Sequence, residues 1–465
     1  MSVENTHYGA RIISASLAFC KSIFFIGIGG ISMSALAELS LRSGFSVGGS
    51  DRSHSDLTRT LEEKGATVFI GHDAAHVEGY DAVVYTVAID PENPEYLAAK
   101  AAHKPLFSRA DYLGYVMSKF RTRIGIAGMH GKTSCTAITA EILCHAADPT
   151  VFCGAKLPAL NNSPCRIGQT REHFLFEACE YMDSFLDFSP TLAVILNIGL
   201  DHVDYFQSMD QIRESFLRYA EQVGEDGCVL YNADDAECRR TFADFGRVTH
   251  TFAIRSPAEY TAKSIRASHG ALTFDFCHGD EVLCTPTLHG VGLHNVYNAL
   301  AAASAAHLTG IYPQAIEEGI CAFTGAGRRM EYKGRLLSGA TVYDDYAHHP
   351  DEIRATLSAA RELGAKRILC IYQPHTYSRT AALLDEFASA LGDADRVLLA
   401  DVYAAREENR FGVTSETLAK RIGIKAHYYG TLEKLAGAVS AQACPDDLVL
   451  VMGAGDIDRI FPLLL

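Results

Sequence analysis

Short apolar runs alternate with helix-length stretches along the whole chain. In the first part, SIFFIGIGG is typical of a buried strand that runs into glycines, and ISMSALAELSLRSG is typical of a helix that ends at Gly44. FSVGGSD and DAVVYTVAI predict two further strands. Because helix-length segments separate these strands, the pattern indicates a parallel α/β sheet.

The same pattern returns twice along the chain. A new strand–glycine–helix unit, RIGIAGMHGKTSCTAITAEIL, begins at Arg123 and precedes the apolar runs FLFEACE and TLAVILNIG. From Val229 to about Leu288 the pattern is more irregular, and ALTFDFCHGDEVLCTPTL predicts a hairpin there. The last segment contains TVYDDYAHHP, RILCIYQPH, DRVLLADVY and DLVLVMGAGD, separated by helices such as DEIRATLSAARELG.

These segments predict an α/β protein of three consecutive domains with mostly parallel sheets. The length of 465 residues agrees, because it exceeds what one hydrophobic core normally serves. We predict a Rossmann-like domain at 1–121, a P-loop-type central domain at 122–325 and a second Rossmann-like domain at 326–465.

Composition narrows the possible partners and the compartment. The net charge of −15 argues against nucleic-acid partners, which need a basic surface. The longest apolar stretches, such as Ile23–Ile28, are shorter than the roughly 20 residues of a membrane span. The start lacks a signal peptide, and the thirteen cysteines form no CxxC pair. We therefore expect a cytoplasmic protein with reduced thiols, without membrane insertion, as a monomer or weak homodimer.

A glycine-containing loop stands between a predicted strand and a predicted helix, with the sequence Gly128-Met129-His130-Gly131-Lys132-Thr133-Ser134. Glycines let backbone N–H groups approach an anion, and Lys132 has the reach for terminal phosphates. The Thr133 hydroxyl is suited to Mg²⁺. Because Ile126 stands where GxxxxGK(S/T) has its first glycine, an ordinary glycine turn is the alternative. The context favours nucleotide binding.

Two other strands of the central segment end in groups that suit a metal ion. Glu177 and Glu180 end FLFEACE, and carboxylates are ligands that Mg²⁺ prefers. His202, between Asp201 and Asp204, follows TLAVILNIG and is suited to a second ion or to orienting a carboxylate. Solvated glutamates and a structural histidine are the alternatives.

The first segment contains a second glycine turn. Gly27, Gly29 and Gly30 lie between strand and helix, and Asp51 ends the next strand. This pattern is typical of a dinucleotide fingerprint, but Ser32 replaces its third glycine. The turn therefore supports binding of a nucleotide-like diphosphate better than binding of NAD, and a tight turn without ligand is the alternative.

The remaining candidates lie at the end of the central segment and in the third segment. Asn295 and Asn298 share one face if they are helical, where they suit a purine or, alternatively, a helix cap. Arg329 follows a glycine-rich turn and suits a phosphate. Two further strands end in polar residues, in Asp344-Asp345-Tyr346-Ala347-His348-His349-Pro350 and Gln373-Pro374-His375-Thr376-Tyr377-Ser378-Arg379.

Together these stretches resemble the Mur ligase family in the same order over nearly the whole chain: GIGGISMSALA, GMHGKTS, EACEYMDSFL, NIGLDHVDYF, GLHNVYNALAA, GRRMEYKG, DDYAHHPDEI, QPHTYSRT, VYAARE and MGAGD. GIGGxxMS together with DDYAHHP and QPHxxxR is similar to the alanine-adding branch. The resemblance implies an ATP- and Mg²⁺-dependent ligase that joins L-alanine to UDP-N-acetylmuramate through an acyl phosphate, in peptidoglycan precursor synthesis. It also implies that the first domain binds the UDP moiety and that the third closes over both ligands.

The resemblance also implies roles for individual residues. The metal ligands of the family correspond to Thr133, Glu177 and His202 in this chain. Its ATP contacts correspond to Lys132 and Arg329 at the phosphates, Asp345 at the ribose, and Asn295 and Asn298 near the adenine. The sugar-acid and amino-acid end corresponds to His348, His375 and Arg379.

The chain departs from the family pattern at a few positions. Met129 stands where threonine is usual, and Thr376 replaces an arginine of some members. QSMDQIRESFLRYAE contains no lysine, as in the alanine-adding branch. Three alternatives remain: a recycling ligase that adds a tripeptide to the same sugar acid, a non-catalytic UDP-sugar sensor, and a nicotinamide dehydrogenase. The last leaves the GKTS loop and the third segment unexplained.

Overall fold

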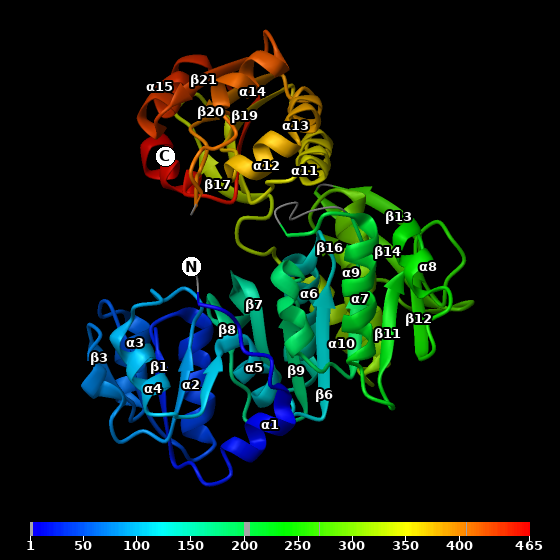
Figure 1. Cartoon of the computed structure of the whole chain (residues 1–465). Coiled ribbons are helices and arrows are strands. Elements are labelled where there is room, and N and C mark those ends of the chain that lie inside the picture. The colour runs from blue at the N-terminus through cyan, green and yellow to red at the C-terminus, as the bar shows by residue number, and fades with distance from the viewer. Residues whose placement is uncertain (1–2, 200–204, 269, 406) are drawn as a thin grey trace.

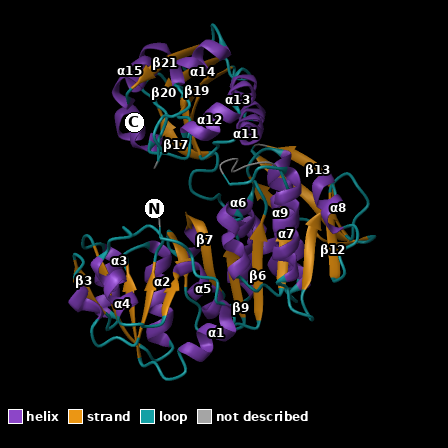
Figure 2. Cartoon of the chain, in the orientation of Figure 1, coloured by secondary structure: helices purple, strands orange, loops and turns teal. Residues whose placement is uncertain are grey.

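Three sheets organise the chain in the computed structural model, which describes residues 3–199, 205–268, 270–405 and 407–465. Figure 1 shows the part that contains the first sheet in blue, the central part in cyan to green, and the third part in yellow to red above them. Helices lie against the faces of the sheets (Figure 2). The predicted fold class, α/β with mostly parallel sheets in three parts, is confirmed.

The first sheet has five strands, all parallel, in the order β3-β2-β1-β4-β5. The strands are β1 (Ser22–Ile26), β2 (Ser46–Asp51), β3 (Thr67–Ile70), β4 (Ala82–Tyr85) and β5 (Leu106–Ser108). The helices are α1 (Gly9–Ser16), α2 (Ile31–Arg42), α3 (Asp56–Glu63), α4 (Pro94–Ala101) and α5 (Arg109–Met117). The run from Ile23 to Ile26 is fully buried because β1 is covered on both faces.

The central sheet has eleven strands, with β6 near its middle. The strands are β6 (Thr122–Ala127), β7 (Thr150–Leu157), β8 (Ser163–Arg166), β9 (His173–Glu177), β10 (Leu192–Ile195), β11 (Cys228–Asn232), β12 (Val248–Ala253), β13 (Tyr260–Ser268), β14 (Ala271–His278), β15 (Glu281–Cys284) and β16 (Thr287–His289). The helices are α6 (Lys132–Ala146), α7 (Met209–Glu221), α8 (Ala236–Phe242), α9 (Leu293–Leu308) and α10 (Pro313–Ala322).

The region that begins at Val229 is more regular than the sequence predicted. β11 pairs in parallel with β10 on one side and with β12 on the other, so the parallel sheet continues through it. The predicted hairpin is confirmed, because β14 pairs antiparallel with β15. β11 and β12 have fewer buried residues than the neighbouring β10, so a hydrophobicity pattern shows them less clearly.

The third sheet has six strands in the order β17-β18-β22-β19-β20-β21, and only the pairing of β17 with β18 is antiparallel. The strands are β17 (Glu331–Arg335), β18 (Thr341–Asp345), β19 (Arg367–Tyr372), β20 (Arg396–Ala400), β21 (Ala426–Gly430) and β22 (Asp447–Met452). The helices are α11 (Pro350–Glu362), α12 (Tyr377–Ala382), α13 (Leu384–Leu391), α14 (Ser415–Ile422), α15 (Leu432–Gln442) and α16 (Phe461–Leu464).

Close helix packing holds in place the glycine-containing loop at residues 128–134, called the phosphate loop below. α6 packs against α9 and α10, and α9 is rich in buried alanines. A Cβ at Gly319 would lie only 2.4 Å from the Cα of Ile142, so α10 approaches α6 more closely than a larger side chain allows. The start of α6 is therefore fixed by a packed core. Within the described residues, no helix is long and apolar enough to cross a membrane.

Candidate functional site

The loop after β6 has the geometry of an anion cradle. β6 ends at Ala127, and α6 begins at Lys132. Gly128 and Gly131 have positive φ values of 144° and 83°, which glycine adopts without the strain that a side chain brings. Backbone N–H groups at the start of α6 have no partner in their own helix, so they are available to a negatively charged ligand.

Lys132 is held by acceptors that a phosphate can replace. Its Nζ donates to the carbonyl oxygens of Gly128 at 2.6 Å and Met129 at 3.2 Å, and it lies 3.0 Å from a carboxylate oxygen of Glu180. The two side chains are only 13% and 1% exposed. Burial disfavours the charged amine, but Glu180 raises the pKa of Lys132 above its ordinary value. The lysine therefore stays protonated at the loop.

Glu177 and Thr133 form a pair of oxygen donors beside this lysine. The Thr133 hydroxyl donates to Oε1 of Glu177 at 3.0 Å, and the backbone N–H of Gly154 donates to Oε2 at 2.9 Å. A hydroxyl and a carboxylate at one point suit Mg²⁺, which takes oxygen ligands and keeps several waters. The residues therefore fit the ion expected from the sequence. His202 lies outside the described residues.

The cradle predicts a specific effect of a Cβ at Gly131. The Cβ of Gly131→Ala would meet Oδ1 of Asn298 at 2.4 Å, at a φ of 83°. We expect nucleotide affinity, measured by calorimetry, to fall at least about tenfold, since the loop and Asn298 must both shift. Gly65→Ala is the matched control, because Gly65 also has a positive φ, of 97°, but no atom within 4 Å of its added Cβ. Equal nucleotide affinity in the two variants would contradict this reading of the loop.

A cavity of about 300 Å³ lies between the phosphate loop and α11. Seven residues predicted from the sequence line it: His130, Gly131, Ser134, Asn295, Asn298, Arg329 and Asp345. Asn295 and Asn298 both lie in α9, as the prediction required, although the Asn295 amide also donates to the carbonyl of Val291 at 2.7 Å. The cavity thus gathers residues from the central and third parts.

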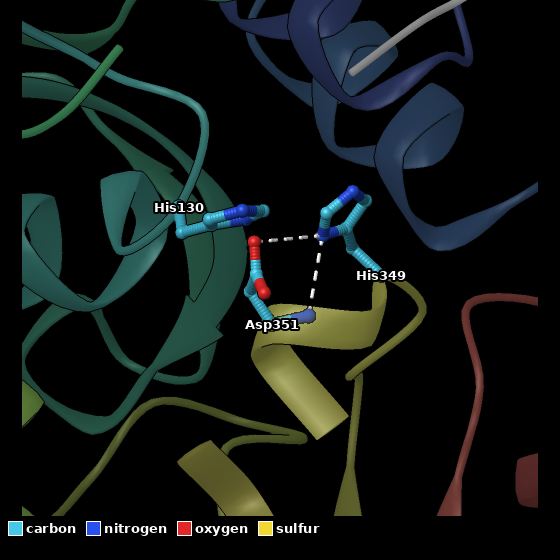
Figure 3. A group of neighbouring side chains, drawn as sticks. All are labelled: His130, His349 and Asp351. Atoms are coloured by element: carbon cyan, nitrogen blue, oxygen red, sulfur yellow. Dashed lines mark hydrogen bonds and ion pairs between the residues drawn. The ribbon is translucent and has the colours of Figure 1, made fainter. Parts of the chain in front are cut away.

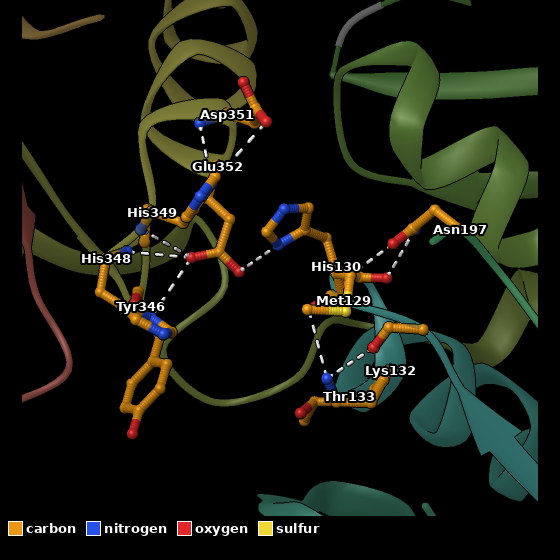
Figure 4. Close-up of polar contacts among 12 residues, drawn as sticks. Met129, His130, Lys132, Thr133, Asn197, Tyr346, His348, His349, Asp351 and Glu352 are labelled. Atoms are coloured by element: carbon orange, nitrogen blue, oxygen red, sulfur yellow. Dashed lines mark hydrogen bonds and ion pairs between the residues drawn. The ribbon is translucent and has the colours of Figure 1, made fainter. Parts of the chain in front are cut away.

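Asn197 connects the phosphate loop to the end of β10. Its Oδ1 accepts from the backbone N–H of His130 at 2.9 Å, and its amide donates to the carbonyl of His130 at 3.0 Å (Figure 4). This two-way bond fixes the middle of the loop before a ligand arrives. The sequence analysis named NIGLDHVD only for its histidine, so it missed this role of the asparagine.

Asp345 and Arg329 form the wall that the third part contributes. Asp345 accepts from the backbone N–H groups of Met330 and Ala347, both at 2.8 Å. Burial raises the pKa of Asp345 although Arg329 is close. The guanidinium of Arg329 lies 5.0 Å above the ring of Tyr346, in the range of a cation–π contact. The hydrogen bonds of Asp345 therefore hold the turn that carries Arg329.

Glu352 joins the central and third parts, and the sequence analysis did not predict it. Its carboxylate lies 3.2 Å from Nδ1 of His130 and 3.2 Å from Nδ1 of His348, and its Oε2 accepts from the backbone N–H of His348 at 3.0 Å (Figure 4). Burial opposes its ionisation, but the charge of His348 and the bond from His130 hold the pKa of Glu352 well below its usual value. The sequence feature that could have identified Glu352 is its position one helical turn after His348.

His348, His375 and Arg379 lie together at the ends of two strands. The rings of His348 and His375 are 6.0 Å apart, and Nδ1 of His375 lies 3.4 Å from the guanidinium of Arg379. His375 also stacks on Tyr403 with ring centroids 5.6 Å apart. The sequence named these three side chains as one group, and the structure places them in one group, adjacent to Glu352.

The first sheet has its own candidate site, separate from the cavity. The backbone N–H of Gly29 donates to Oδ2 of Asp51 at 2.9 Å, and Gly27 has a φ of 85°. Gly30 caps α2, and Ser32 lies in its first turn. The turn thus brings Asp51 against a helix N-terminus, where an anionic ligand finds free backbone N–H groups. None of these residues lines the cavity described above.

Three family models match successive parts of the chain. A model described as "Mur ligase family, catalytic domain" matches residues 22–121, "Mur ligase middle domain" matches 126–306, and "Mur ligase, glutamate ligase domain" matches 328–455.

Related proteins match the chain over nearly its full length. The chain is 42% identical over 449 residues to a UDP-N-acetylmuramate–L-alanine ligase of Clostridium novyi, which covers 96% of this chain and 97% of the relative. It is 43% identical over 447 residues to the ligase of the same name from Caldicellulosiruptor bescii, covering 95% and 98%.

Solved structures resemble the whole chain. The UDP-N-acetylmuramate-alanine ligase of Thermotoga maritima has a TM-score of 0.76 at 28% identity and covers 95% of this chain and 97% of its own. A murein peptide ligase of Psychrobacter arcticus has a TM-score of 0.67 at 24% identity, covering 96% and 98%, so it shows the fold alone.

Proposed function

The chain belongs to the Mur ligase family, and from that premise we propose that it is an ATP-dependent ligase that joins L-alanine to the carboxylate of UDP-N-acetylmuramate. Near-complete coverage at 42% identity to a relative of that name supports this reaction. One structural observation carries it. The phosphate loop with Lys132 adjoins a cavity of about 300 Å³ whose walls come from the central and third parts.

We assign the ligands to the three parts by their geometry. The cavity, with Asn295 and Asn298 on one wall and Asp345 on the other, takes the nucleoside of ATP. Its phosphates extend toward Lys132. Residues 1–121 take the UDP moiety at the turn that holds Asp51, 122–325 take ATP, and 326–465 close the site.

The first chemical step activates the sugar acid. A carboxylate oxygen of the substrate attacks the γ-phosphorus of ATP, ADP leaves, and an acyl phosphate forms. Both reactants are anions, so positive charge at the γ-phosphate lowers the barrier. Lys132 supplies that charge when its Nζ exchanges the carbonyls of Gly128 and Met129 for phosphate oxygens, and Arg329 adds a second cation from the third part.

Mg²⁺ held by Thr133 and Glu177 supplies further neutralisation of phosphate charge when it is bound. In the second step the amine of L-alanine attacks the acyl carbon, and inorganic phosphate leaves as the amide forms. His348, His375 and Arg379, which lie together beside Glu352, are placed to hold the anionic groups and to take the proton that the amine loses.

The test is ADP release by the purified protein with ATP, Mg²⁺ and UDP-N-acetylmuramate. We expect turnover to require both the sugar acid and an amine, and to be fastest with L-alanine among L-alanine, glycine, D-glutamate and an L-alanyl tripeptide. Turnover with the tripeptide alone would assign the chain to recycling instead. Binding of the nucleotide sugar without turnover for any amine would leave the sensor as the better reading.

A further inference from the structure

A group of three possible metal ligands lies between the central and third parts. The proposed reaction gives these three side chains no joint role. His130 comes from the phosphate loop, His349 caps α11, and Asp351 lies in the first turn of α11 (Figure 3). One ligand atom from each lies within 4.8 Å of the other two. The rings of His130 and His349 are 4.9 Å apart at 36°. Figure 3 shows the Asp351 carboxylate between the two rings.

A carboxylate orients the ring of His130. A carboxylate only accepts hydrogen bonds, so Nδ1 of His130 donates to Oε1 of Glu352 at 3.2 Å. In the neutral form of such a ring, Nε2 carries the lone pair that a metal ion binds. A carboxylate that orients a histidine through its other nitrogen is the usual support of a metal-ligating imidazole. Glu352 thus acts on His130 as such a partner does.

His349 is also oriented for coordination. Its Nδ1 accepts from the backbone N–H of Asp351 at 3.3 Å, a long hydrogen bond that is easily exchanged for a stronger ligand. The same atom lies 3.7 Å from Oδ2 of Asp351, and the His349 side chain is only 9% exposed. One ring nitrogen and one carboxylate oxygen of α11 therefore already face the same point.

We propose that His130, His349 and Asp351 form a binding site for a transition-metal cation of the Zn²⁺ class, which ties the phosphate loop to α11. Ligand atoms around tetrahedral Zn²⁺ lie about 3.4 Å apart for bonds of about 2.1 Å, so shifts of about an ångström close the site. Two imidazoles select Zn²⁺ over Mg²⁺, which prefers oxygen. The fourth position is left to water, as at other sites with three protein ligands.

The site has a consequence for nucleotide binding. His130 and Asp351 both line the 300 Å³ cavity, so a cation between them occupies part of its wall. Zn²⁺ and ATP therefore compete, and the cation acts as an inhibitor that holds the third part against the central part. This consequence rests on the proposed function, whereas the cation site itself does not.

The first test is Zn²⁺ binding to the full-length protein without nucleotide, measured by competition with a chromophoric chelator. We expect one site whose affinity falls at least about tenfold in His349→Ala and in Asp351→Asn, and about tenfold in Glu352→Gln. The control is the double variant His250→Ala/His278→Ala, which removes the two histidines beside Glu259. Unchanged affinity in His349→Ala and Asp351→Asn would overturn the proposal, as would loss of the site in the control.

A second measurement separates folding from coordination and the site from the reaction. Co²⁺ bound in place of Zn²⁺ is expected to give a tetrahedral visible spectrum in wild type that disappears in Asp351→Asn, a substitution that conserves shape. With free Zn²⁺ fixed by a chelator buffer, ATP affinity should fall at least tenfold in wild type and remain constant in His349→Ala. If the protein binds Zn²⁺ at this site but no ATP, the proposed function fails and the cation site stands.

Discussion

Replacing Lys132 with alanine is expected to lower ligase turnover by about a thousandfold, the effect of removing a cation or donor that stabilises developing charge in a dry site. Lys132 is the only lysine or arginine in residues 128–134, and its Nζ lies against the carbonyl oxygens of Gly128 and Met129, where we propose that the phosphates bind. ATP affinity should fall much less than turnover, since backbone N–H groups bind most of the phosphate charge.

The structure also predicts that Lys132→Ala lowers the stability of the protein, and this effect must be separated from the loss of turnover. Glu180 is 1% exposed and faces Lys132 at 3.0 Å, so Lys132→Ala leaves a buried carboxylate without its cation. Breaking such a pair costs about 3–5 kcal/mol. We expect Lys132→Ala to unfold at a lower temperature than wild type, and Lys132→Ala/Glu180→Gln to regain most of that stability because the uncompensated charge is gone.

Comparison of the two variants decides between a catalytic and a structural role. If Lys132 acts on the phosphates, the stabilised double variant remains as inactive as Lys132→Ala. Recovery of turnover together with stability would show that Lys132 only neutralises Glu180. ADP release and thermal unfolding, measured on the same samples at a temperature where all three proteins are folded, give both quantities.

The sequence predicted the parts of the site that depend on local geometry. The phosphate loop needs a strand, two glycines, a lysine and a helix in succession, so GMHGKTS placed Gly131 and Lys132 correctly relative to β6 and α6. The same holds for Asn295 and Asn298, whose three-residue spacing puts them on one face of α9. Local spacing carries this information because helix and strand periods are fixed.

Contacts between distant segments were harder to predict. Nothing near Glu352 in the chain indicates that its carboxylate reaches His130, which is 222 residues away. Glu180 and Lys132 are 48 residues apart, and the sequence analysis named Glu180 only as a candidate Mg²⁺ ligand beside Glu177. The buried ion pair depends on how β9 and β6 lie side by side, which is a property of the sheet. Sheet order determines such pairs, and sheet order is not a local property.

Replacing Glu177 with glutamine is the second substitution with a large expected effect. Glutamine conserves the shape of the side chain and can still accept one of the hydrogen bonds that Thr133 and Gly154 donate, so we expect stability to change by no more than about 1 kcal/mol. It removes the negative charge that a divalent cation requires. We therefore expect kcat to fall about a hundredfold and the Mg²⁺ concentration for half-maximal turnover to rise about tenfold.

Two further variants give this experiment its controls. Glu177→Asp keeps the charge on a shorter side chain and should show a smaller loss that excess Mg²⁺ partly restores. Glu259→Gln changes a carboxylate that also has two hydrogen-bond partners, here the side chains of His250 and His278, and should leave both kcat and the Mg²⁺ requirement unchanged. An unaltered Mg²⁺ requirement in Glu177→Gln would mean that the ion is held without Glu177, and the pairing of Thr133 with Glu177 would then serve only to fix the start of α6.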